Sequence, residues 1–271
     1  MTNVKDLVLT EIVDAVFFDT LTGDLWFSLD ELQNWTLNQA EESTNVTGRR
    51  GRLITTIKKN KTITLSGTNG LVSAGLLEAQ TGNKFKKGTT TVQWTDYLKV
   101  SSNAATTAYK AVGTAGSEIM ALYVKADDET IGTELTQVAS GTTLTTGKFT
   151  YDPSTKALAF YSGDIADGKE IVVIYMRQLS GSVLKVDNGT VSGDAIAYVN
   201  ALAEDVCHNV YRVQFYFPNI AFSGAFSLAT GGDQTTHGFE ATAEADGCAV
   251  GGAELFTYTV FGANAADVVS A

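Results

Sequence analysis

Short stretches in which apolar and polar residues alternate recur along the whole chain, and turns that contain glycine separate them. Successive side chains of a strand point to opposite faces, so each such stretch predicts a strand with one buried face. The composition points the same way, because 26 glycines and only 2 prolines, together with many threonines, favour strands and tight turns over helices. We therefore expect a mainly β fold.

The proportions of apolar and charged residues exclude two broad classes of protein. Of the 271 residues, 44% are hydrophobic and 18% are charged, which is too apolar for an intrinsically disordered chain. No apolar run approaches the roughly 20 residues that a membrane-spanning helix needs, so we expect no membrane partner. The first residues lack the pattern of an export signal, and we expect the protein to be made in the cytoplasm.

The first fifty residues predict a hairpin followed by a basic loop. Strands over 13–18 and 25–29, joined by a turn at 21–24, form the hairpin. Residues 46–52 have no apolar side chain after Val46 and contain two glycines. They therefore predict a mobile loop that joins one strand to the next.

Two more strands are expected over the next fifty residues. The first covers 53–66, but its apolar and polar residues do not keep one register. We therefore expect a turn or bulge at 59–60. The second strand is expected over 89–100.

One helix is well supported by the sequence. The apolar spacing over 71–82 predicts a helix of about ten residues that starts from Thr68 or Asn69 and stops at Gly82. A second, weaker helix is expected over 195–202.

Residues 109–178 are expected to form a unit of their own. Its strands are predicted over 119–124, 148–151, 157–161 and 171–176. Polar or glycine-containing turns separate them, which predicts a small β-sandwich or an elaborated set of hairpins. Soft flanks rich in serine and alanine set the domain boundaries at 1–108, 109–180 and 181–271, with the middle part inserted or added.

The last third of the chain supplies four more strands. They are predicted over 210–217, 222–229, 239–245 and 254–261. In the first of them, the odd-numbered apolar residues share one face and are expected to lie in the core. These residues are Tyr211, Val213, Phe215 and Phe217.

The net charge of −11 argues against a protein that coats nucleic acid, because phosphate binding needs a basic surface. The charge is unevenly distributed. Residues 45–100 hold ten basic side chains against two acidic ones, whereas residues 201–271 hold eight acidic side chains against one basic one, Arg212. Opposed patches suit contacts between copies of the same chain. The alternative is that they are solvated loops that happen to differ in sign.

The sequence offers no convincing catalytic or metal site. His208 and His237 are too few for a histidine-based metal site. Cys207 and His208 are adjacent, so on a strand they would point to opposite faces and could not act together. Cys207 and Cys248 lack a CxxC spacing and are expected to be small thiols rather than a disulfide, and the carboxylates at 127–129 fit a solvated turn. We expect no enzyme activity, no metal and no cofactor.

Several segments together form a recognisable pattern. Residues 210–228 read VYRVQFYFPNIAFSGAFSL, residues 238–246 read GFEATAEAD, and residues 255–261 read LFTYTVF. With the basic loop, long hairpin and single helix of residues 46–82, they resemble the major tail tube proteins of long, non-contractile-tailed bacteriophages. Residues 109–178 fall outside the resemblance.

The resemblance implies a tail-tube-like β-sandwich with one flanking helix. Such subunits form hexameric rings that stack into a hollow tube, similar to type VI secretion tubes. The protein would be made in the host bacterial cytoplasm and reside in the virion tail. Its partners would be copies of itself and other tail proteins, namely the tape measure, the tail terminator and the baseplate or tip. Genomic DNA would pass through the lumen without specific binding, and an acidic chain suits that passage because it repels phosphate.

The basic loop is the candidate contact between rings. Arg49, Arg50 and Arg52 can each bind a carboxylate with two hydrogen bonds. The expected acidic partners are Glu240, Glu244 and Asp246. The competing interpretation is that these arginines touch DNA in the lumen.

Two other classes of function stay open. One is a different virion structural protein, such as a capsid decoration or tail terminator protein, which would form trimers or a single ring. The other is a carbohydrate-binding adhesion module, in which exposed aromatic residues of 109–178 would contact the glycan. For the tube, we expect 109–178 to lie on the outside, so that its deletion leaves assembly intact.

Overall fold

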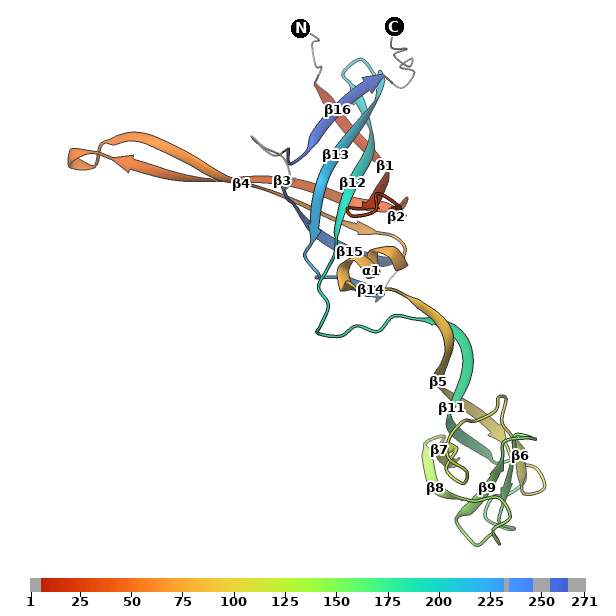
Figure 1. The fold of residues 1–271 in the computed structure, drawn as a ribbon. Coiled ribbons are helices and arrows are strands. Elements are labelled where there is room, and N and C mark those ends of the chain that lie inside the picture. The colour runs from red at the N-terminus through yellow and green to blue at the C-terminus, as the bar shows by residue number, and fades with distance from the viewer. Residues whose placement is uncertain (1–5, 232–233, 246–253, 263–271) are drawn as a thin grey trace. The chain divides into compact units, whose positions relative to one another are not determined.

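The computed structural model describes residues 6–231, 234–245 and 254–262. The chain forms two compact units (Figure 1). One contains Met1–Phe85 together with Leu184–Ala271, and we call it the split unit. The other is the continuous segment Lys86–Val183, which we call the insert. The predicted mainly β fold is confirmed, since strands dominate both units.

The split unit contains nine strands and one α-helix among its described residues. They are β1 (Leu7–Asp19), β2 (Leu25–Leu29), β3 (Leu32–Thr47), β4 (Leu53–Asn69), α1 (Ala74–Thr81), β12 (Asp194–Asp205), β13 (Val210–Phe222), β14 (Ser227–Gly231), β15 (Gln234–Ala243) and β16 (Thr257–Gly262). The strands follow the order β2-β1-β12-β13-β15-β4-β3, with β16 added to β13 and β14 added to β15. The predicted hairpin at the start of the chain is formed by β1 and β2.

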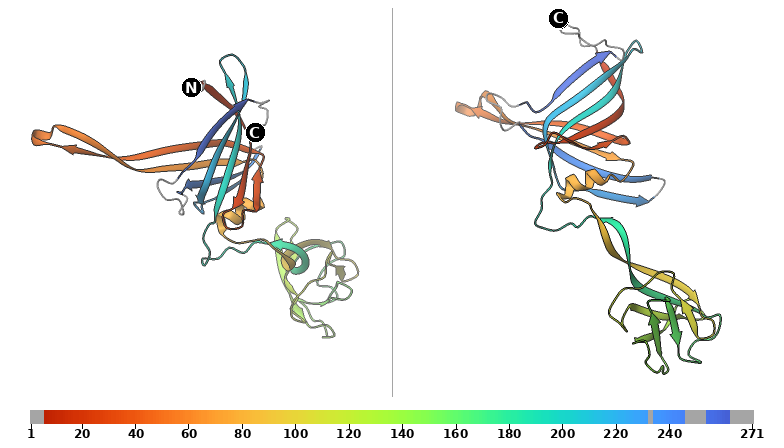
Figure 2. Two further views of the ribbon diagram at one scale, coloured as in Figure 1. Left: turned by 45° about the horizontal axis from the view of Figure 1, so that its top comes forward. Right: turned by 45° about the vertical axis from the view of Figure 1, so that its right-hand side comes forward.

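The sheet folds over at β13 and so becomes a sandwich of two layers. The first layer contains β2, β1, β12, β13 and β16, and the second contains β3, β4, β14 and β15. Residues 211–216 of β13 pair with β16, whereas residues 220–222 pair with β15. Aromatic rings from the two layers meet in the core. The ring centroids of Phe17 and Phe239 lie 6.5 Å apart, and those of Trp35 and Phe215 lie 4.9 Å apart. The right-hand view of Figure 2 shows the two layers crossing.

The inner face of β12 is built almost entirely from alanine. Ala195, Ala197, Ala201 and Ala203 are fully or almost fully buried, together with Val199. The helix predicted over 195–202 is therefore wrong. Alanine favours helices in isolation, but here β1 and β13 pair with β12 along both edges, and tertiary pairing outweighs propensity.

Helix α1 is shorter than predicted and starts later. The backbone N–H of Leu76 donates to Oγ of Ser73, so Ser73 is the N-cap. Thr68 and Asn69 were expected in this role but lie in β4, where they pair with β15. The predicted stop at Gly82 is confirmed by a left-handed φ of 68°.

His237 joins the sheet to this helix from a fully buried position on β15. The backbone N–H of Ser73 donates to its Nδ1 at 3.3 Å, and its Nε2 lies 2.8 Å from Oε1 of Gln80. An Nδ1 that accepts carries no proton, so the ring is neutral and donates from Nε2. Burial lowers the pKa of His237 below its ordinary value.

This burial predicts a loss of stability in mild acid. As the pH falls below about 6.5, the unfolded chain gains a proton at His237 that the folded chain excludes, so the melting temperature falls until the lowered folded pKa is reached. His237→Gln lacks that proton and should show a flatter melting temperature between about pH 7 and 5 by circular dichroism. His208 is exposed and is present in both proteins, so its contribution is the same in each and drops out of the difference between their melting temperatures. Identical slopes in the two proteins would contradict the prediction.

The insert forms a seven-stranded sheet with its own core. Its strands are β5 (Lys86–Lys99), β6 (Ala104–Thr106), β7 (Ile119–Lys125), β8 (Ile131–Val138), β9 (Lys148–Asp152), β10 (Ala157–Phe160) and β11 (Glu170–Val183), in the order β5-β11-β7-β8-β9-β10-β6. All four strands expected between 109 and 178 are present as β7, β9, β10 and β11. The short strand β6 and strand β8 were not expected.

The insert begins earlier in the chain than the expected boundary at 109. Strand β5 pairs with β11 along its full length, from Lys86 opposite Val183 to Lys99 opposite Glu170. Residues 86–108 therefore group with the insert rather than with the N-terminal segment.

This pairing predicts how the insert can be removed. Because Lys86 and Val183 are neighbours across the two strands, a short Gly/Ser bridge from Phe85 to Leu184 should leave the split unit folded with a cooperative thermal transition. The matched control deletes only 109–178. The expectation from the sequence that this deletion leaves assembly intact is revised, because it removes most of β11, the partner of β5, and should cause aggregation. Circular dichroism and size-exclusion chromatography measure both outcomes. Loss of the folded state on removal of 86–183 would contradict the independence of the split unit.

Candidate assembly surfaces

Strands β3 and β4 continue beyond the sandwich as a two-stranded ribbon, which we call the arm (residues 38–62). It is the long orange hairpin of Figure 1. Every residue of β4 from Leu53 to Thr62 is exposed, whereas burial alternates strictly from Ile63 to Asn69. The change coincides with β15, whose pairing with β4 ends at Ile63. The arm therefore lacks the third strand that supports the rest of β4.

The tip of the arm carries the three arginines of the predicted basic loop. This segment is a tight turn: the backbone N–H of Gly48 donates to the carbonyl of Arg52 at 2.8 Å, and that of Gly51 donates to the carbonyl of Gly48 at 3.1 Å. Arg50 adopts a left-handed φ of 65° within it. All three arginine side chains are exposed, and the described residues form no ion pair with them.

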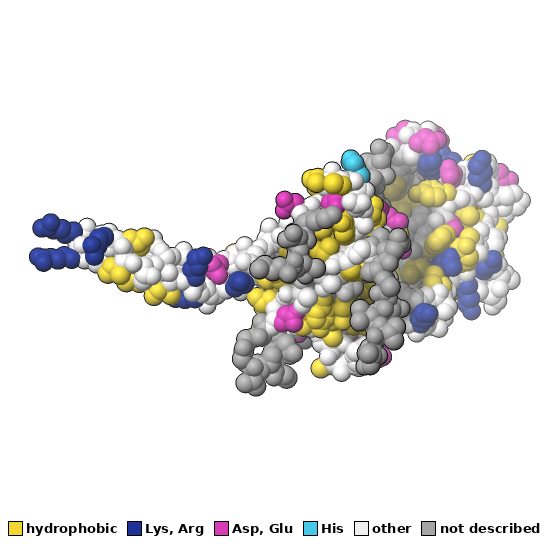
Figure 3. Space-filling view, turned by 90° about the horizontal axis from the view of Figure 1, so that it is seen from above, with side chains coloured by type: hydrophobic (Ala, Val, Ile, Leu, Met, Phe, Trp, Pro, Cys, Tyr) yellow, Lys and Arg dark blue, Asp and Glu magenta, His cyan; other side chains and the backbone are white. Residues whose placement is uncertain are grey.

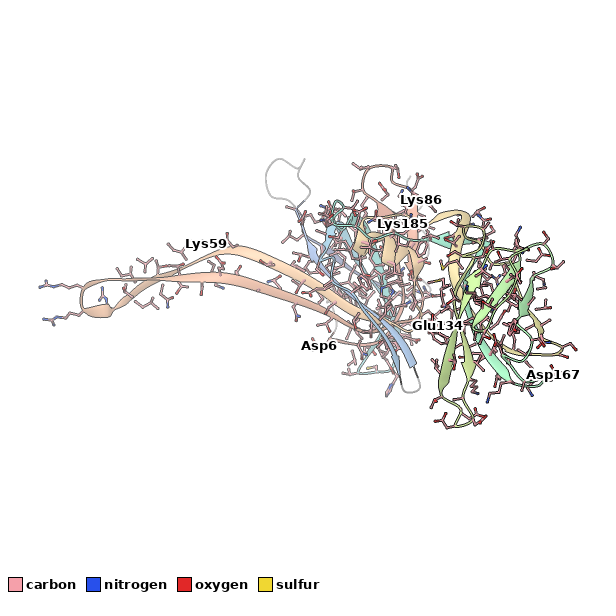
Figure 4. The ribbon with its side chains drawn as sticks, turned by 90° about the horizontal axis from the view of Figure 1, so that it is seen from below. Asp6, Lys59, Lys86, Glu134, Asp167 and Lys185 are labelled. Carbon is pink, nitrogen blue, oxygen red and sulfur yellow. The ribbon has the colours of Figure 1, made fainter. Side chains whose placement is uncertain are left out.

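The irregularity predicted at 59–60 is confirmed as a β-bulge in the arm. Glu41 lies opposite Lys61 and Glu42 lies opposite Lys59, which leaves Asn60 as the extra residue with a φ of 54°. Its side-chain amide donates to Oε2 of Glu42 at 2.7 Å. A bulge bends a ribbon and increases its twist. Figure 4 shows Lys59 on this part of the arm.

The arm also exposes large apolar side chains. Leu53, Ile54 and Ile57 are 55%, 62% and 51% exposed. An isolated two-stranded hairpin is marginally stable in water, and exposed apolar side chains on such a ribbon indicate a contact surface. Figure 3 shows hydrophobic side chains along the arm, and basic side chains both at its end and nearer the sandwich. The sequence alone does not reveal this surface, because Ile57 has the same parity along the chain as the buried Ile63 and Leu65.

The expected acidic partners lie on the sandwich. Glu240 is exposed on β15, opposite Ser66 of β4. Glu244 is exposed just after β15, where its backbone N–H donates to the carbonyl of Asn219. Asp246 lies outside the described residues. Within the part of the chain that the structure describes, the arginines and these carboxylates form no ion pair with one another.

Among the described strands, two edges of the first layer have no strand partner over part or all of their length. Strand β1 pairs with β12 from Leu7 to Asp19, but β2 covers its other side only from Ala15 to Phe18. A groove of about 520 Å³ separates the open part of β1 from the start of β3. The indole N–H of Trp35, which lines this groove, is buried and has no hydrogen-bond partner among the described residues. At the opposite end of the layer, β16 pairs with β13 alone, as far as the described strands go.

The outer face of the same layer carries a row of hydrogen-bonded polar side chains. The side-chain amide of Asn200 donates to Oδ1 of Asp14 at 2.6 Å, and that of Gln214 donates to Oδ1 of Asn200 at 2.9 Å. These residues lie opposite one another on β1, β12 and β13. The row ties three neighbouring strands together on the face that points away from the core.

The other residues considered as sites do not converge on a chemical centre. Cys207 and His208 lie in the exposed turn after β12 rather than on a strand, and His208 contacts the carboxylate of Glu204. Cys248 lies outside the described residues. The predicted solvated turn at 127–129 is confirmed, and the ammonium of Lys169 lowers the pKa of Asp127 by a direct hydrogen bond. The described residues contain no group of three potential metal ligands and no helix of membrane-spanning length and apolarity.

A comparison with protein families assigns the chain to a family, which the surfaces alone do not do. The model of the YomU/Tube protein family matches residues 7–251. The chain belongs to this family. YomU/Tube membership makes it a phage tube-like structural protein and a component of the virion tail, which confirms the resemblance seen in the sequence in this coarser form. No curated protein matches the chain.

The architecture predicts uneven hydrogen exchange within one strand. In dispersed protein, amides 53–62 of β4 should exchange much faster than amides 63–69, because only the latter segment is buried and paired on both sides. Hydrogen-deuterium exchange mass spectrometry measures both segments in the same sample, so residues 63–69 serve as the internal control. Equal protection of the two segments in dispersed protein would show that the arm has support of its own.

Proposed function

We propose that this protein self-assembles into hexameric rings that stack into the tail tube of a long, non-contractile-tailed phage. DNA is delivered through that tube. The observation that carries the proposal is the arm, an exposed ribbon with apolar sides and a basic tip that gains support only when another subunit covers it. Membership of the YomU/Tube family supports the same function.

Ring formation uses the two open edges of the first layer. The edge of β16 in one subunit pairs with the open part of β1, from Leu7 to Asp14, in the next. Backbone hydrogen bonds then continue from subunit to subunit, and the unpartnered N–H of Trp35 gains an acceptor in the groove. A closed ring removes both open edges at once. The number six comes from the resemblance to tail tube proteins.

The lumen is lined by the outer face of this layer. Its inner face is covered by the second layer and α1, which are too bulky for the inside of the ring. The row of Asp14, Asn200 and Gln214 therefore faces the channel. These three side chains do not bind phosphate as lysine or arginine would, so the duplex can slide past them. Arg212, two residues before Gln214 on the same face of β13, is exposed and is a basic side chain that the duplex meets beside them.

The arm joins one ring to the next. Its arginines reach the carboxylates of Glu240 and Glu244 on a subunit of the neighbouring ring, with Asp246 as a third partner. Guanidinium and carboxylate groups pair through two hydrogen bonds and fix the register between rings. Because the arm is supported only after stacking, free subunits do not polymerise early.

The remaining partners follow from this position in the virion. The ends of the tube contact the tail terminator and the baseplate or tip, and the tape measure protein occupies the lumen during assembly. The insert lies on the outside of the tube, because its volume cannot fit in the channel.

Replacing Arg49, Arg50 and Arg52 with Ser tests the role of the arm. We expect a melting temperature within about 2 °C of the wild type, since exposed side chains contribute little to stability, and loss of long tubes in negative-stain electron microscopy. Rings should remain, because the β1 and β16 edges are untouched.

A matched control removes the same charge elsewhere. The side chains of Lys87, Lys99 and Lys148 are exposed on the insert, and their replacement with Ser should leave long tubes. Tubes of normal length from the arginine variant would refute the role of the arm. Trimers or single rings of the wild type that never stack would instead support a capsid decoration or tail terminator protein.

A further inference from the structure

A loop of the insert is held in place by buried side chains. The backbone N–H of Ala108 donates to Oδ2 of Asp96 at 2.8 Å, and the N–H of Tyr109 donates to the hydroxyl of Tyr175 at 3.1 Å. The hydroxyl of Thr107 donates to the carbonyl of Tyr109 at 2.8 Å. These bonds fix the backbone on both sides of Tyr109, whose ring is 42% exposed.

Asp96 is the centre of this network. Its side chain lies on β5 with 7% of its surface exposed, and it accepts hydrogen bonds from the indole N–H of Trp94 at 2.9 Å and the hydroxyl of Tyr175 at 2.8 Å. Burial, with the nearby carboxylate, raises the pKa of Tyr175 to about 12, so its hydroxyl remains a donor. The network orients Trp94 as well as the loop.

The outcome at the surface is a rigid group of two aromatic rings and one cation. The rings of Trp94 and Tyr109 lie 5.2 Å apart at 87°, and Trp94 is 37% exposed. The guanidinium carbon of Arg177 lies 3.4 Å from the centre of the Tyr109 ring and 4.8 Å from that of Trp94. The buried Nε of Arg177 has no hydrogen-bond partner among the described residues. We call Trp94, Tyr109 and Arg177 the platform.

The charge around the platform is positive, although the chain as a whole carries −11. Lys110 is exposed beside Tyr109, and the ammonium of Lys156 donates to the carbonyl of Ala108 at 3.1 Å. Both carboxylate oxygens of Asp96 accept hydrogen bonds in its buried position. The ammonium groups of Lys110 and Lys156 and the guanidinium of Arg177 therefore attract an anionic ligand.

We propose that the platform binds an anionic polysaccharide. The C–H face of one sugar ring packs on Tyr109, on the side that the Arg177 guanidinium does not cover, and Trp94, whose ring stands at 87° to that of Tyr109, contacts the same polysaccharide chain at a second position. The carboxylate of the sugar accepts hydrogen bonds from Arg177 and the neighbouring lysines. A sugar ring has apolar C–H faces and a polar rim, so it can contact the aromatic rings and the cations at the same time. An apolar peptide side chain has no polar group for the cations to bind. The buried network lowers the entropic cost of binding, because the rings are ordered before the ligand arrives.

Binding is measured by isothermal titration calorimetry on the full chain with two oligosaccharides of equal length, hexagalacturonate and cellohexaose. We expect hexagalacturonate to bind with a dissociation constant on the order of 0.1 to 1 mM and cellohexaose to bind at least about tenfold more weakly. Equal affinity for the two would overturn the assignment to an anionic ligand. No binding of either would overturn the site itself.

Variants separate the platform from general effects on folding. Tyr109→Ala keeps the backbone bonds of the loop and should weaken hexagalacturonate about tenfold, and Arg177→Gln should do the same. The control is Tyr97→Ala. Tyr97 is 66% exposed and lies on β5 like Trp94, but on the opposite face, so this substitution should have no effect on binding. Circular dichroism checks that each variant is folded. An equal loss from Tyr97→Ala, or no loss from Tyr109→Ala, would overturn the proposal. The test does not depend on tube assembly.

Discussion

Pairing of β12 on both of its edges is the constraint on which the split unit depends. Strand β12 follows the insert in sequence, yet it lies between β1 from the start of the chain and β13 from its end. Its alanine face lets the aromatic residues of the other strands fill the core, with Phe17, Phe27 and Phe222 packed together. Because the two halves of the unit meet at this strand, the insert can interrupt the chain without dividing the core.

The sequence predicted most strands because alternation follows directly from half-burial. It failed where local pattern and tertiary context disagree. Strand β12 looked helical because alanine is the best helix former, and only its two neighbours reveal it as a strand. Strand β8 was missed because Leu135 is its single buried residue, which leaves no alternation to detect. The start of the insert was missed because pairing between β5 and β11 is not visible in either segment alone.

The candidate assembly surfaces were predictable in part for a similar reason. Clustered arginines between glycines mark the tip of the arm without any knowledge of the fold. The apolar surface beside them does not stand out, because Ile57 and Ile63 look alike in the sequence. They differ in two respects: β15 pairs with β4 as far as Ile63 and no further, and the bulge at Asn60 turns Ile57 to the opposite face of the ribbon. The length of one strand thus decides which residues of its neighbour lie in the core and which remain exposed.

The insert has a hydrophobic core of its own, so its ligand site can be altered separately from the surfaces of the split unit. Its core cluster consists of its own residues, and the hydrogen bonds that link Asp96, Tyr175 and the backbone of Tyr109 also lie within the insert. A buried carboxylate is costly unless every oxygen is satisfied, so this network constrains the insert strongly. The edges and the arm belong to the other unit. Substitutions on the platform can therefore alter ligand binding while the surfaces proposed for rings and stacking stay intact.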